Sequence, residues 1–192
     1  MGKIVVSENV SLDGVIQDPT GEEGLGRGHW FDRLGERDLA EWAEALTAEA
    51  LGTEALLLGR RSYEYFAARY PSRRGQWADK LNSMPKYVVS ATLEDPRWTN
   101  TTVLSGDVVN EVSKLKQVVA GDILVYASGR LVPTLIEHDL VDELRLMTYP
   151  LVVGAGQRLF GETSSAKPMG LVDTRTVGDS LVLLAYQPVR ID

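Results

Sequence analysis

Short apolar runs of strand length recur along the chain and alternate with segments of helical spacing. The apolar runs occupy residues 4–6, 55–58, 87–89, 123–126, 144–147 with 151–153, and 181–185. Several of them are continuous rather than alternating in polarity, which is typical of strands that are covered on both faces. The pattern predicts a sheet whose strands are largely buried between helices.

Three segments between the strands place apolar residues at steps of three and four, as one face of a helix does. The second of them runs from residue 108 to 119 behind Asp107 as a plausible N-cap, and the third runs from 131 to 140. A further helix is expected after Ser62. Strands that alternate with helices predict a largely parallel sheet with helices on both faces. The first stripe consists of Leu39, Trp42, Ala43, Leu46 and Ala50, with Glu36, Glu41 and Glu44 off it.

The chain changes character from Asp142 onward, where strand patterns and loops continue without a convincing helix. Residues 177–181 have the composition of a hairpin turn, which indicates antiparallel strands at one edge of the sheet. No linker or internal repeat divides the sequence. We therefore predict a single α/β domain over residues 1–192, with three αβα layers and a mostly parallel, mixed sheet.

Composition narrows the classes of function. The chain has 192 residues, 20 Lys and Arg against 27 Asp and Glu, a net charge of −7 and no cysteine. The missing cysteines exclude disulfides, thiolate metal sites and a cysteine nucleophile. The acidic balance argues against nucleic-acid binding, which requires a concentrated positive face. Neither a signal peptide nor a membrane-spanning run is visible, so we expect a cytoplasmic protein.

The longest irregular stretch, residues 17–35, contains five glycines and the aromatic pair Trp30 and Phe31. A loop of this length inside a compact domain is usually functional or disordered. Large aromatic side chains in a glycine-rich loop usually cover something apolar, which favours a wall of a ligand pocket. A floppy surface insertion is the alternative.

Three turns that follow predicted strands carry the residues suited to bind phosphate. In an open α/β sheet, ligands bind beyond the carboxyl ends of the strands. The first turn, Gly59-Arg60-Arg61-Ser62, offers a tight backbone, two guanidinium groups and a hydroxyl that can cap a helix. It opens a run of five arginines within fifteen residues, and a solvated basic helix start is the competing interpretation. The run consists of Arg60, Arg61, Arg69, Arg73 and Arg74.

The other two turns are Ser90-Ala91-Thr92 and Ala127-Ser128-Gly129-Arg130. Each alone is as well explained by an ordinary connection, and the indication comes from all three lying on one sheet edge. The common phosphate and nucleophile motifs are missing: no G-x-G-x-x-G follows a strand, and neither a P-loop nor a G-x-S-x-G elbow occurs. Two histidines, His29 and His138, cannot supply a His-rich metal site, so no metal is expected.

Taken in order, several short segments resemble the dihydrofolate-reductase-like superfamily. They resemble most the branch related to the C-terminal reductase domain of riboflavin-biosynthesis deaminase-reductases, and they extend over nearly the whole chain. The resemblance implies the dihydrofolate-reductase-like fold. The matching segments are residues 11–14 (SLDG), 57–64 (LLGRRSYE), 86–90 (KYVVS), 128–131 (SGRL), 140–144 (LVDEL) and 150–160 (PLVVGAGQRLF).

The resemblance implies that NADPH binds without the usual dinucleotide fingerprint. The first two turns would hold the 2′-phosphate and pyrophosphate, the third would meet the pyrophosphate and nicotinamide, and the segment after the first strand would border the nicotinamide. Dihydrofolate reductases carry a Gly-Gly pair where this chain has Ala127-Ser128, and side chains there would crowd a close backbone approach. The implied cofactor-binding residues are Gly59, Arg60, Arg61, Ser62, Ser90, Ser128, Gly129, Arg130, Leu131, Asp13 and Gly14.

Folate reductases place a carboxylate on the first helix, and Asp38 occupies a similar place here. It lies about 40° from Trp42 on a helical wheel. A carboxyl group against an aromatic ring in a cleft has a raised proton affinity, which suits a catalytic proton donor. The alternative is a first-turn acid that the helix dipole favours, and Asp32 and Glu36 are nearby competitors for the role.

We therefore expect an NADPH-dependent reductase that transfers hydride to a C=N or carbonyl carbon of a small heterocycle, either pyrimidine-ribosyl or pterin-like. The resemblance places it near riboflavin biosynthesis, as a 5-amino-6-ribosylaminouracil reductase-like or dihydrofolate reductase-like enzyme, and suggests a homodimer. Its partner is a small-molecule substrate, with neither nucleic acid nor membrane involved. The alternative is a nucleotide- or ligand-binding protein that keeps the fold without turnover.

Overall fold

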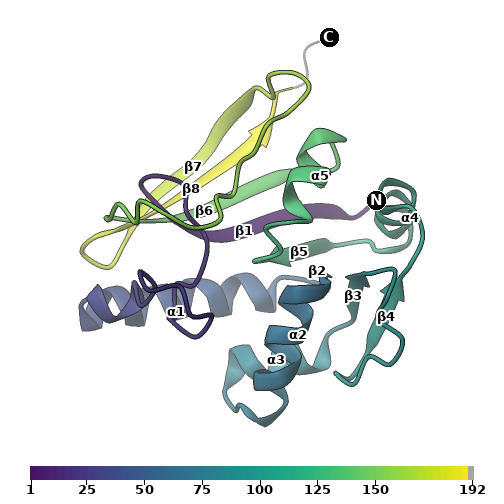
Figure 1. The fold of residues 1–192 in the computed structure, drawn as a ribbon, viewed down its shortest axis with the longest axis horizontal. Helices are drawn as coiled ribbons and strands as arrows, with labels where there is room; N and C mark the ends of the chain where they lie inside the picture. The colour runs from purple at the N-terminus through teal and green to yellow at the C-terminus, as the bar shows by residue number, and fades with distance from the viewer. Residues whose placement is uncertain (190–192) are drawn as a thin grey trace.

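The computed structural model describes residues 1–189, which form one mixed sheet with the strand order β4-β3-β2-β5-β1-β6-β8-β7 (Figure 1). Neighbouring strands from β4 to β6 are parallel, whereas β8 is antiparallel to both β6 and β7. This arrangement confirms the mixed sheet with antiparallel C-terminal strands. The strands are β1 (Lys3–Ser11), β2 (Ala55–Gly59), β3 (Lys86–Val89), β4 (Thr101–Leu104), β5 (Asp122–Tyr126), β6 (Glu143–Tyr149), β7 (Met169–Val177) and β8 (Leu181–Pro188).

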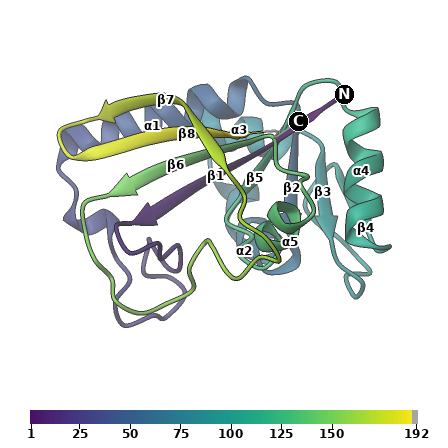
Figure 2. The same cartoon turned by 90° about the horizontal axis from the view of Figure 1, so that it is seen from above.

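Helices cover both faces of the sheet and give three layers. Val5 and Val6 point to opposite faces because side chains alternate along a strand. The cluster around Val5 contains residues of α2 and α3, and the cluster around Val6 contains residues of α4 and α5. From above, α1 runs along the β6, β8 and β7 side (Figure 2). The helices are α1 (Glu36–Leu51), α2 (Arg60–Arg69), α3 (Gln76–Ser83), α4 (Val108–Val118) and α5 (Val132–Glu137).

The predicted face of α1 is rotated from the observed one. Leu39 and Ala43 are exposed, whereas Asp38 is buried and Trp42 and Leu46 are half-buried. The inward face of this helix therefore mixes polar and apolar residues. A search for a purely apolar stripe misplaces such a face because it assigns every carboxylate to solvent.

Other elements also differ from the sequence pattern. Residues 151–153 form no strand, so that prediction is wrong, and their amides take part in a loop described below. The pattern of apolar residues did not predict α3 or β4, and it did not indicate where β7 begins and ends. Residues 171–176 of β7 are exposed on both faces, so no alternation of polarity marks that strand. Within residues 1–189, no helix has the length and apolar composition needed to cross a membrane.

A buried lysine ties α3 to the neighbouring strands. Lys86 is fully buried, and its Nζ donates to the carbonyl oxygens of Asn82 (3.0 Å), Met84 (2.9 Å) and Thr99 (2.9 Å). The ammonium also lies 4.5 Å from the centre of the Trp98 ring, a cation–π contact. Burial lowers the pKa of Lys86 to about 8. The ammonium therefore joins carbonyl groups at the end of α3 to the segment before β4.

We expect Lys86→Met to lower the free energy of unfolding by about 3 kcal/mol, because one buried and two partly buried carbonyl oxygens lose their donor. Urea denaturation measures this change. Lys114→Met is the matched control: Lys114 is 70% exposed, and its ion pair with Glu111 is worth little. Equal losses in the two variants would contradict a structural role for the Lys86 ammonium.

Candidate functional site

A cavity of about 1130 Å³ opens at the carboxyl ends of the central strands. Its place follows from the strand register. Strand β1 pairs with β5 only as far as Ser7 opposite Tyr126, while its pairing with β6 continues to Ser11. Beyond Ser7 the two central strands part, and this edge of β1 faces the cavity. The volume is at the upper end of small-molecule sites and suits a large cofactor together with a small substrate.

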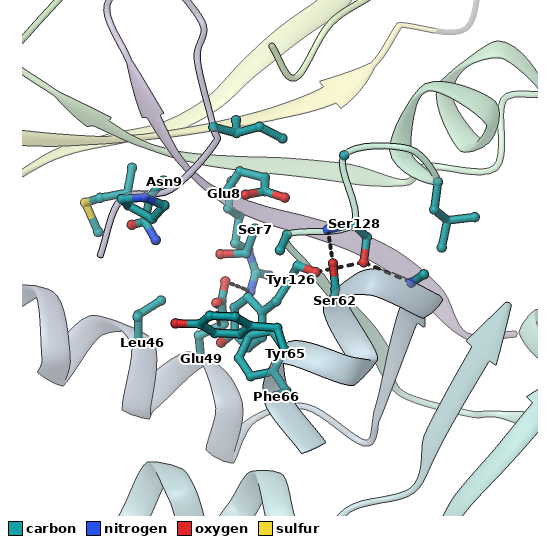
Figure 3. Close-up of a pocket in the computed structure, with 18 of the residues that line it drawn as sticks. Ser7, Glu8, Asn9, Leu46, Glu49, Ser62, Tyr65, Phe66, Tyr126 and Ser128 are labelled. Atoms are coloured by element: carbon teal, nitrogen blue, oxygen red, sulfur yellow. Dashed lines mark hydrogen bonds and ion pairs between the residues drawn. The ribbon is translucent and has the colours of Figure 1, made fainter. Parts of the chain in front are cut away.

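Two strand-end turns interlock at one end of the cavity (Figure 3). The Ser62 hydroxyl accepts a hydrogen bond from the Ser128 amide at 2.8 Å. The Ser128 hydroxyl accepts from the Gly59 amide at 3.0 Å and donates to the Tyr126 carbonyl at 2.9 Å. The turn after β2 and the turn after β5 therefore form one unit, which the sequence pattern only placed on the same edge.

The interlock corrects the predicted role of Ser62 as a helix cap. The N-cap of α2 is Gly59, and Ser62 lies within the first turn of the helix. Ala127 and Ser128 adopt the left-handed conformation, with φ of 51° and 61°. Residues other than glycine rarely do so, and here the hydrogen bonds of Ser128 hold the turn.

The Ser128 side chain is hydrogen-bonded back to the β5 strand end, so it leaves the approach to the turn open. The next residue, Gly129, is a position of close approach. A Cβ there would lie 2.7 Å from both Gln157 Nε2 and Ile16 Cδ1. The tight fit therefore lies one residue after Ala127 and Ser128, and a side chain at that position would displace the ends of Gln157 and Ile16.

Three arginines line this end of the cavity: Arg60, Arg61 and Arg130. The Arg60 guanidinium lies 2.7 Å from Glu64 Oε1 and also donates to the Thr92 hydroxyl. Arg61 acts on Glu23, whose pKa is raised by burial and lowered in part by the Arg61 charge.

The predicted arginine cluster divides in the structure. Arg69 pairs with Glu22 at 2.8 Å, and the Arg73 guanidinium lies over the Tyr70 ring. Arg74 donates only to backbone oxygens. None of these three arginines is among the cavity-lining residues. These three arginines therefore lie outside the cavity, whereas Arg60 and Arg61 line it and are also exposed to solvent.

Ser90 does not line the cavity. Its hydroxyl accepts from the amides of Thr92 (3.2 Å) and Leu93 (3.1 Å), which closes the turn after β3. This turn holds Thr92 against Arg60. Ser90 therefore stabilises the turn that positions Thr92, and Thr92 in turn contacts Arg60 at the end of the cavity lined by the three arginines.

Asp13 and Gly14 also lie outside the cavity wall. The Asp13 carboxylate accepts from the Ser11 hydroxyl (2.7 Å) and from the amides of Val153 (3.0 Å) and Gly154 (2.9 Å). The Ser11 hydrogen bond and these amides lower the pKa of Asp13 to about 2. The pair anchors the loop that brings Gln157 to the cavity, and the expectation that it borders the ligand stays a prediction.

Asp38 is buried, and its partners are in a hairpin. Its carboxylate accepts from the Asp179 amide (2.6 Å) and from the amide (2.9 Å) and hydroxyl (2.6 Å) of Ser180, in the turn between β7 and β8. The Ser180 hydroxyl and these amides lower the pKa of Asp38, which is absent from the cavity wall. The predicted cleft position with raised proton affinity is wrong. Neither competitor, Asp32 nor Glu36, lines the cavity.

Glu8 is a buried carboxyl group of the cavity that the sequence reasoning missed, as it missed Glu49 and Glu143. It lies on β1 directly after the point where β5 leaves, and it is 7% exposed. Its Oε1 is buried and has no hydrogen-bond partner in the described part of the chain. Burial, assisted by the charge of Glu23, raises the pKa of Glu8 well above its ordinary value. A sequence signal exists: a carboxylate follows the apolar run 4–6 inside a central strand.

On the opposite face of β1, two hydrogen bonds fix the orientation of the Asn9 side-chain amide. Trp42 Nε1 donates to Asn9 Oδ1 at 2.9 Å, and the Tyr149 hydroxyl donates to the same oxygen at 3.2 Å. An indole N–H is only a donor, so the Asn9 oxygen must face these partners and its NH₂ group must face away. Asn9 lines the cavity above Leu46 of α1 (Figure 3).

The loop 17–35 is a packed cavity wall. Trp30 is fully buried, and Phe31 stacks on Tyr149 with ring centres 5.6 Å apart. The buried Asp18 carboxylate accepts from the amides of Glu23 and Leu25, each at 2.8 Å. These contacts contradict the floppy alternative.

The floor of the cavity contains a network of charged and phenolic groups. Arg145 of β6 lies 2.6 Å from Glu143 and 3.2 Å from Glu49 of α1. The Tyr126 hydroxyl donates to the other Glu49 oxygen at 3.0 Å. The polar groups here satisfy one another, in contrast to Glu8. No group of three metal-ligating side chains occurs in the described residues.

Comparisons with known proteins agree with this geometry. Residues 2–183 match the family model of the RibD C-terminal domain. The uncharacterized protein YyaP of Bacillus subtilis (strain 168) is 26% identical over 189 residues, which cover 96% of this chain and 94% of YyaP. The family match confirms the resemblance to the riboflavin-biosynthesis branch.

Solved structures share the fold. A putative riboflavin biosynthesis protein from Shewanella sp. PV-4 has a TM-score of 0.72 at 21% identity, covering 98% of this chain and 99% of that one. The dihydrofolate reductase of Enterococcus faecalis, solved with NADP(H), has a TM-score of 0.58 at 15% identity, covering 97% and 96%. These matches confirm the dihydrofolate-reductase-like three-layer fold.

We expect Asp38→Asn to lower the free energy of unfolding by about 2 kcal/mol at pH 7, because hydrogen bonds to a charged acceptor are lost. The folded-state pKa of Asp38 is lowered, so its contribution is complete above the ordinary aspartate pKa and disappears as the pH falls through the folded-state value. The difference from wild type should therefore shrink below about pH 4.

Urea denaturation at several pH values measures this effect. The control is Asp32→Asn, since the Asp32 side chain is 75% exposed. A difference between Asp38→Asn and wild type that grows on acidification would contradict the anchoring role.

Proposed function

Because the chain belongs to the RibD C-terminal domain family, we propose that it is an NADPH-dependent reductase that transfers hydride to a C=N or carbonyl carbon of a small heterocycle. The observation that carries this proposal is the interlocked pair of strand-end turns, with three arginines beside it, at one end of a large cavity. The family points to a reductase of the riboflavin-biosynthesis type, which favours a pyrimidine-ribosyl substrate, with a pterin-like ring as the other candidate.

The donors at this end fit a phosphate-bearing dinucleotide. Arg60 and Arg61 supply forked guanidinium groups in the first turn of α2, where the free amides of a ten-residue helix also favour an anion. Ser62 and Ser128 hold the two turns at a fixed separation. Gly129 lets Gln157 and Ile16 pack closely against the turn, which fixes the place of its backbone beside the cavity. We assign the 2′-phosphate to Arg60 and Arg61, and the pyrophosphate side to the turn from Ser128 to Leu131.

The bound cofactor would supply the reducing equivalent, and the protein supplies orientation and a dry site. The parting of β1 and β5 leaves a slot beside Glu8 and Asn9 for the reacting ring. Phe31, Trp42 and Leu46 exclude water on the α1 side. Asn9 presents its NH₂ group to the ligand. We further propose that the enzyme acts as a cytoplasmic homodimer on a small molecule, without nucleic acid.

Titration with NADPH and NADH, followed by quenching of tryptophan fluorescence and by thermal stability, tests the cofactor. We expect NADPH to bind at least about tenfold more tightly, because a guanidinium pair with the 2′-phosphate contributes about 1.4 kcal/mol or more. Arg60→Ala and Arg61→Ala should each remove most of this preference while they leave NADH binding nearly unchanged.

Arg74→Ala is the matched control, since Arg74 lies outside the cavity and donates only to backbone oxygens. Equal affinity for the two cofactors in the wild type, or equal losses for both in Arg60→Ala, would overturn the assignment. NADPH binding without oxidation in the presence of pyrimidine, pterin or quinone-like acceptors would instead support a binding protein without turnover.

A further inference from the structure

We propose that Glu8 is the catalytic proton donor of the reductase reaction and that it works from a neutral carboxyl group at the edge of β1. This assignment rests on the proposed function, because it requires a hydride donor in the same cavity. It replaces Asp38, whose carboxylate is committed to the hairpin between β7 and β8.

The position of Glu8 follows from the sheet. Its side chain is on the Val6 face of β1, where an apolar cluster includes Val6, Val10, Leu131 and Leu146. Leu146 of β6 is its partner in register. On the other side of β1 the ladder to β5 has ended one residue earlier, so the carboxyl group meets the cavity instead of a neighbouring strand. Figure 3 shows it extending from β1 in the direction of the Ser128 turn.

The environment keeps a proton on Glu8. A carboxylate with an unpartnered oxygen, 7% exposed and against aliphatic side chains, is strongly disfavoured relative to the neutral acid. A neutral carboxyl group also has an O–H to donate, which an ionised one lacks. The charge of Glu23 acts in the same direction as burial.

The other charged side chains around the cavity interact with partners other than Glu8. Glu49 is held by Arg145 and Tyr126, and Arg61 faces the exposed Glu23. Arg60 is paired with Glu64, and Arg130 lies in the turn after β5. Among the described residues that line the cavity, Glu8 is the carboxyl group that is buried and free of an ion pair. The Tyr126 hydroxyl is a poorer acid, because burial raises its pKa further.

The reaction balances with Glu8 in this role. Bound NADPH would supply a hydride, with its electron pair, to the substrate carbon and would be oxidised to NADP⁺. The π electrons of the C=N or C=O bond move to the nitrogen or oxygen. That atom takes the proton from the Glu8 carboxyl group, and the resulting carboxylate regains a proton from solvent. The net change is the addition of H⁻ and H⁺ across the double bond.

The first test needs no substrate. Infrared difference spectra between wild type and Glu8→Gln, taken with and without NADP⁺, report the protonated carboxyl band directly. We expect that band at pH 7 in the wild type, absent from Glu8→Gln, and titrating at a pH well above the ordinary glutamate range. Glu23→Gln should move this titration to lower pH, because it removes a neighbouring negative charge. An ionised Glu8 at pH 7 would overturn the proposal.

The second test measures single-turnover oxidation of NADPH with 5-amino-6-ribosylaminouracil 5′-phosphate and with dihydrofolate. In the wild type, the rate constant should fall as the pH rises through the Glu8 pKa, since the acid form is the active one. Glu8→Gln should lower the rate constant by about 10²–10⁴ and abolish this pH dependence. Glu8→Asp keeps an acid and should restore the pH dependence at an intermediate rate.

Glu44→Gln, on the exposed side of α1, is the matched control and should leave the rate and profile unchanged. The NADPH titration separates the two proposals. If NADPH does not bind, the reductase function fails. If NADPH binds but the wild type reduces neither compound, the reductase function fails as well. If the wild type reduces either compound and Glu8→Gln reacts at the same rate, the Glu8 assignment alone fails. Thermal stability of each variant, equal to wild type within a few degrees, shows that the fold is retained.

Discussion

The hydrogen bonds between the turns after β2 and β5 are the constraint on which the cavity depends. Ser62 and Ser128 join two connections that are 66 residues apart in the sequence, and Gly59 closes the link. They hold Ala127 and Ser128 in a conformation that neither residue would adopt alone. Because the turn after β5 is fixed in this way, β5 ends while β1 continues, and the opening between the two strands is built into the sheet.

Much of the fold could be predicted from the sequence because central strands have a strong signal. Buried β1, β2 and β5 read as continuous apolar runs, and the alternation with helices fixes their parallel order. The signal fails where burial is incomplete. Strand β7 is exposed on both faces, and the inward face of α1 mixes carboxylates with apolar residues. Neither segment shows a regular period of two or 3.6 residues. The ends of β7 were therefore not predicted, and the predicted inward face of α1 is rotated from the observed one.

The arginines at one end of the cavity could be predicted from the sequence, but the carboxyl group that we propose as the proton donor could not. Arg60, Arg61 and Arg130 lie where strand ends place them, because that edge is a property of topology. Asp38 and Glu8 show the limit. Both are buried carboxyl groups near 5% exposure, yet the partners of Asp38 come from a hairpin 141 residues away and Glu8 has none for one oxygen. Such tertiary partners decide the protonation state, and local sequence does not contain them.

The contrast between these two carboxyl groups also bears on how an acidic protein would accommodate the anionic cofactor that we propose. Each carboxylate near the cavity floor has a partner: Glu49 and Glu143 share Arg145. Glu8 avoids charge altogether, because its surroundings favour the neutral acid. Arg61 and Arg130 line the cavity together with Glu23, and a neutral Glu8 adds no further negative charge beside them. In the proposed reaction a neutral Glu8 would serve two purposes, since the proton that it donates to the substrate also removes a charge that would repel the cofactor.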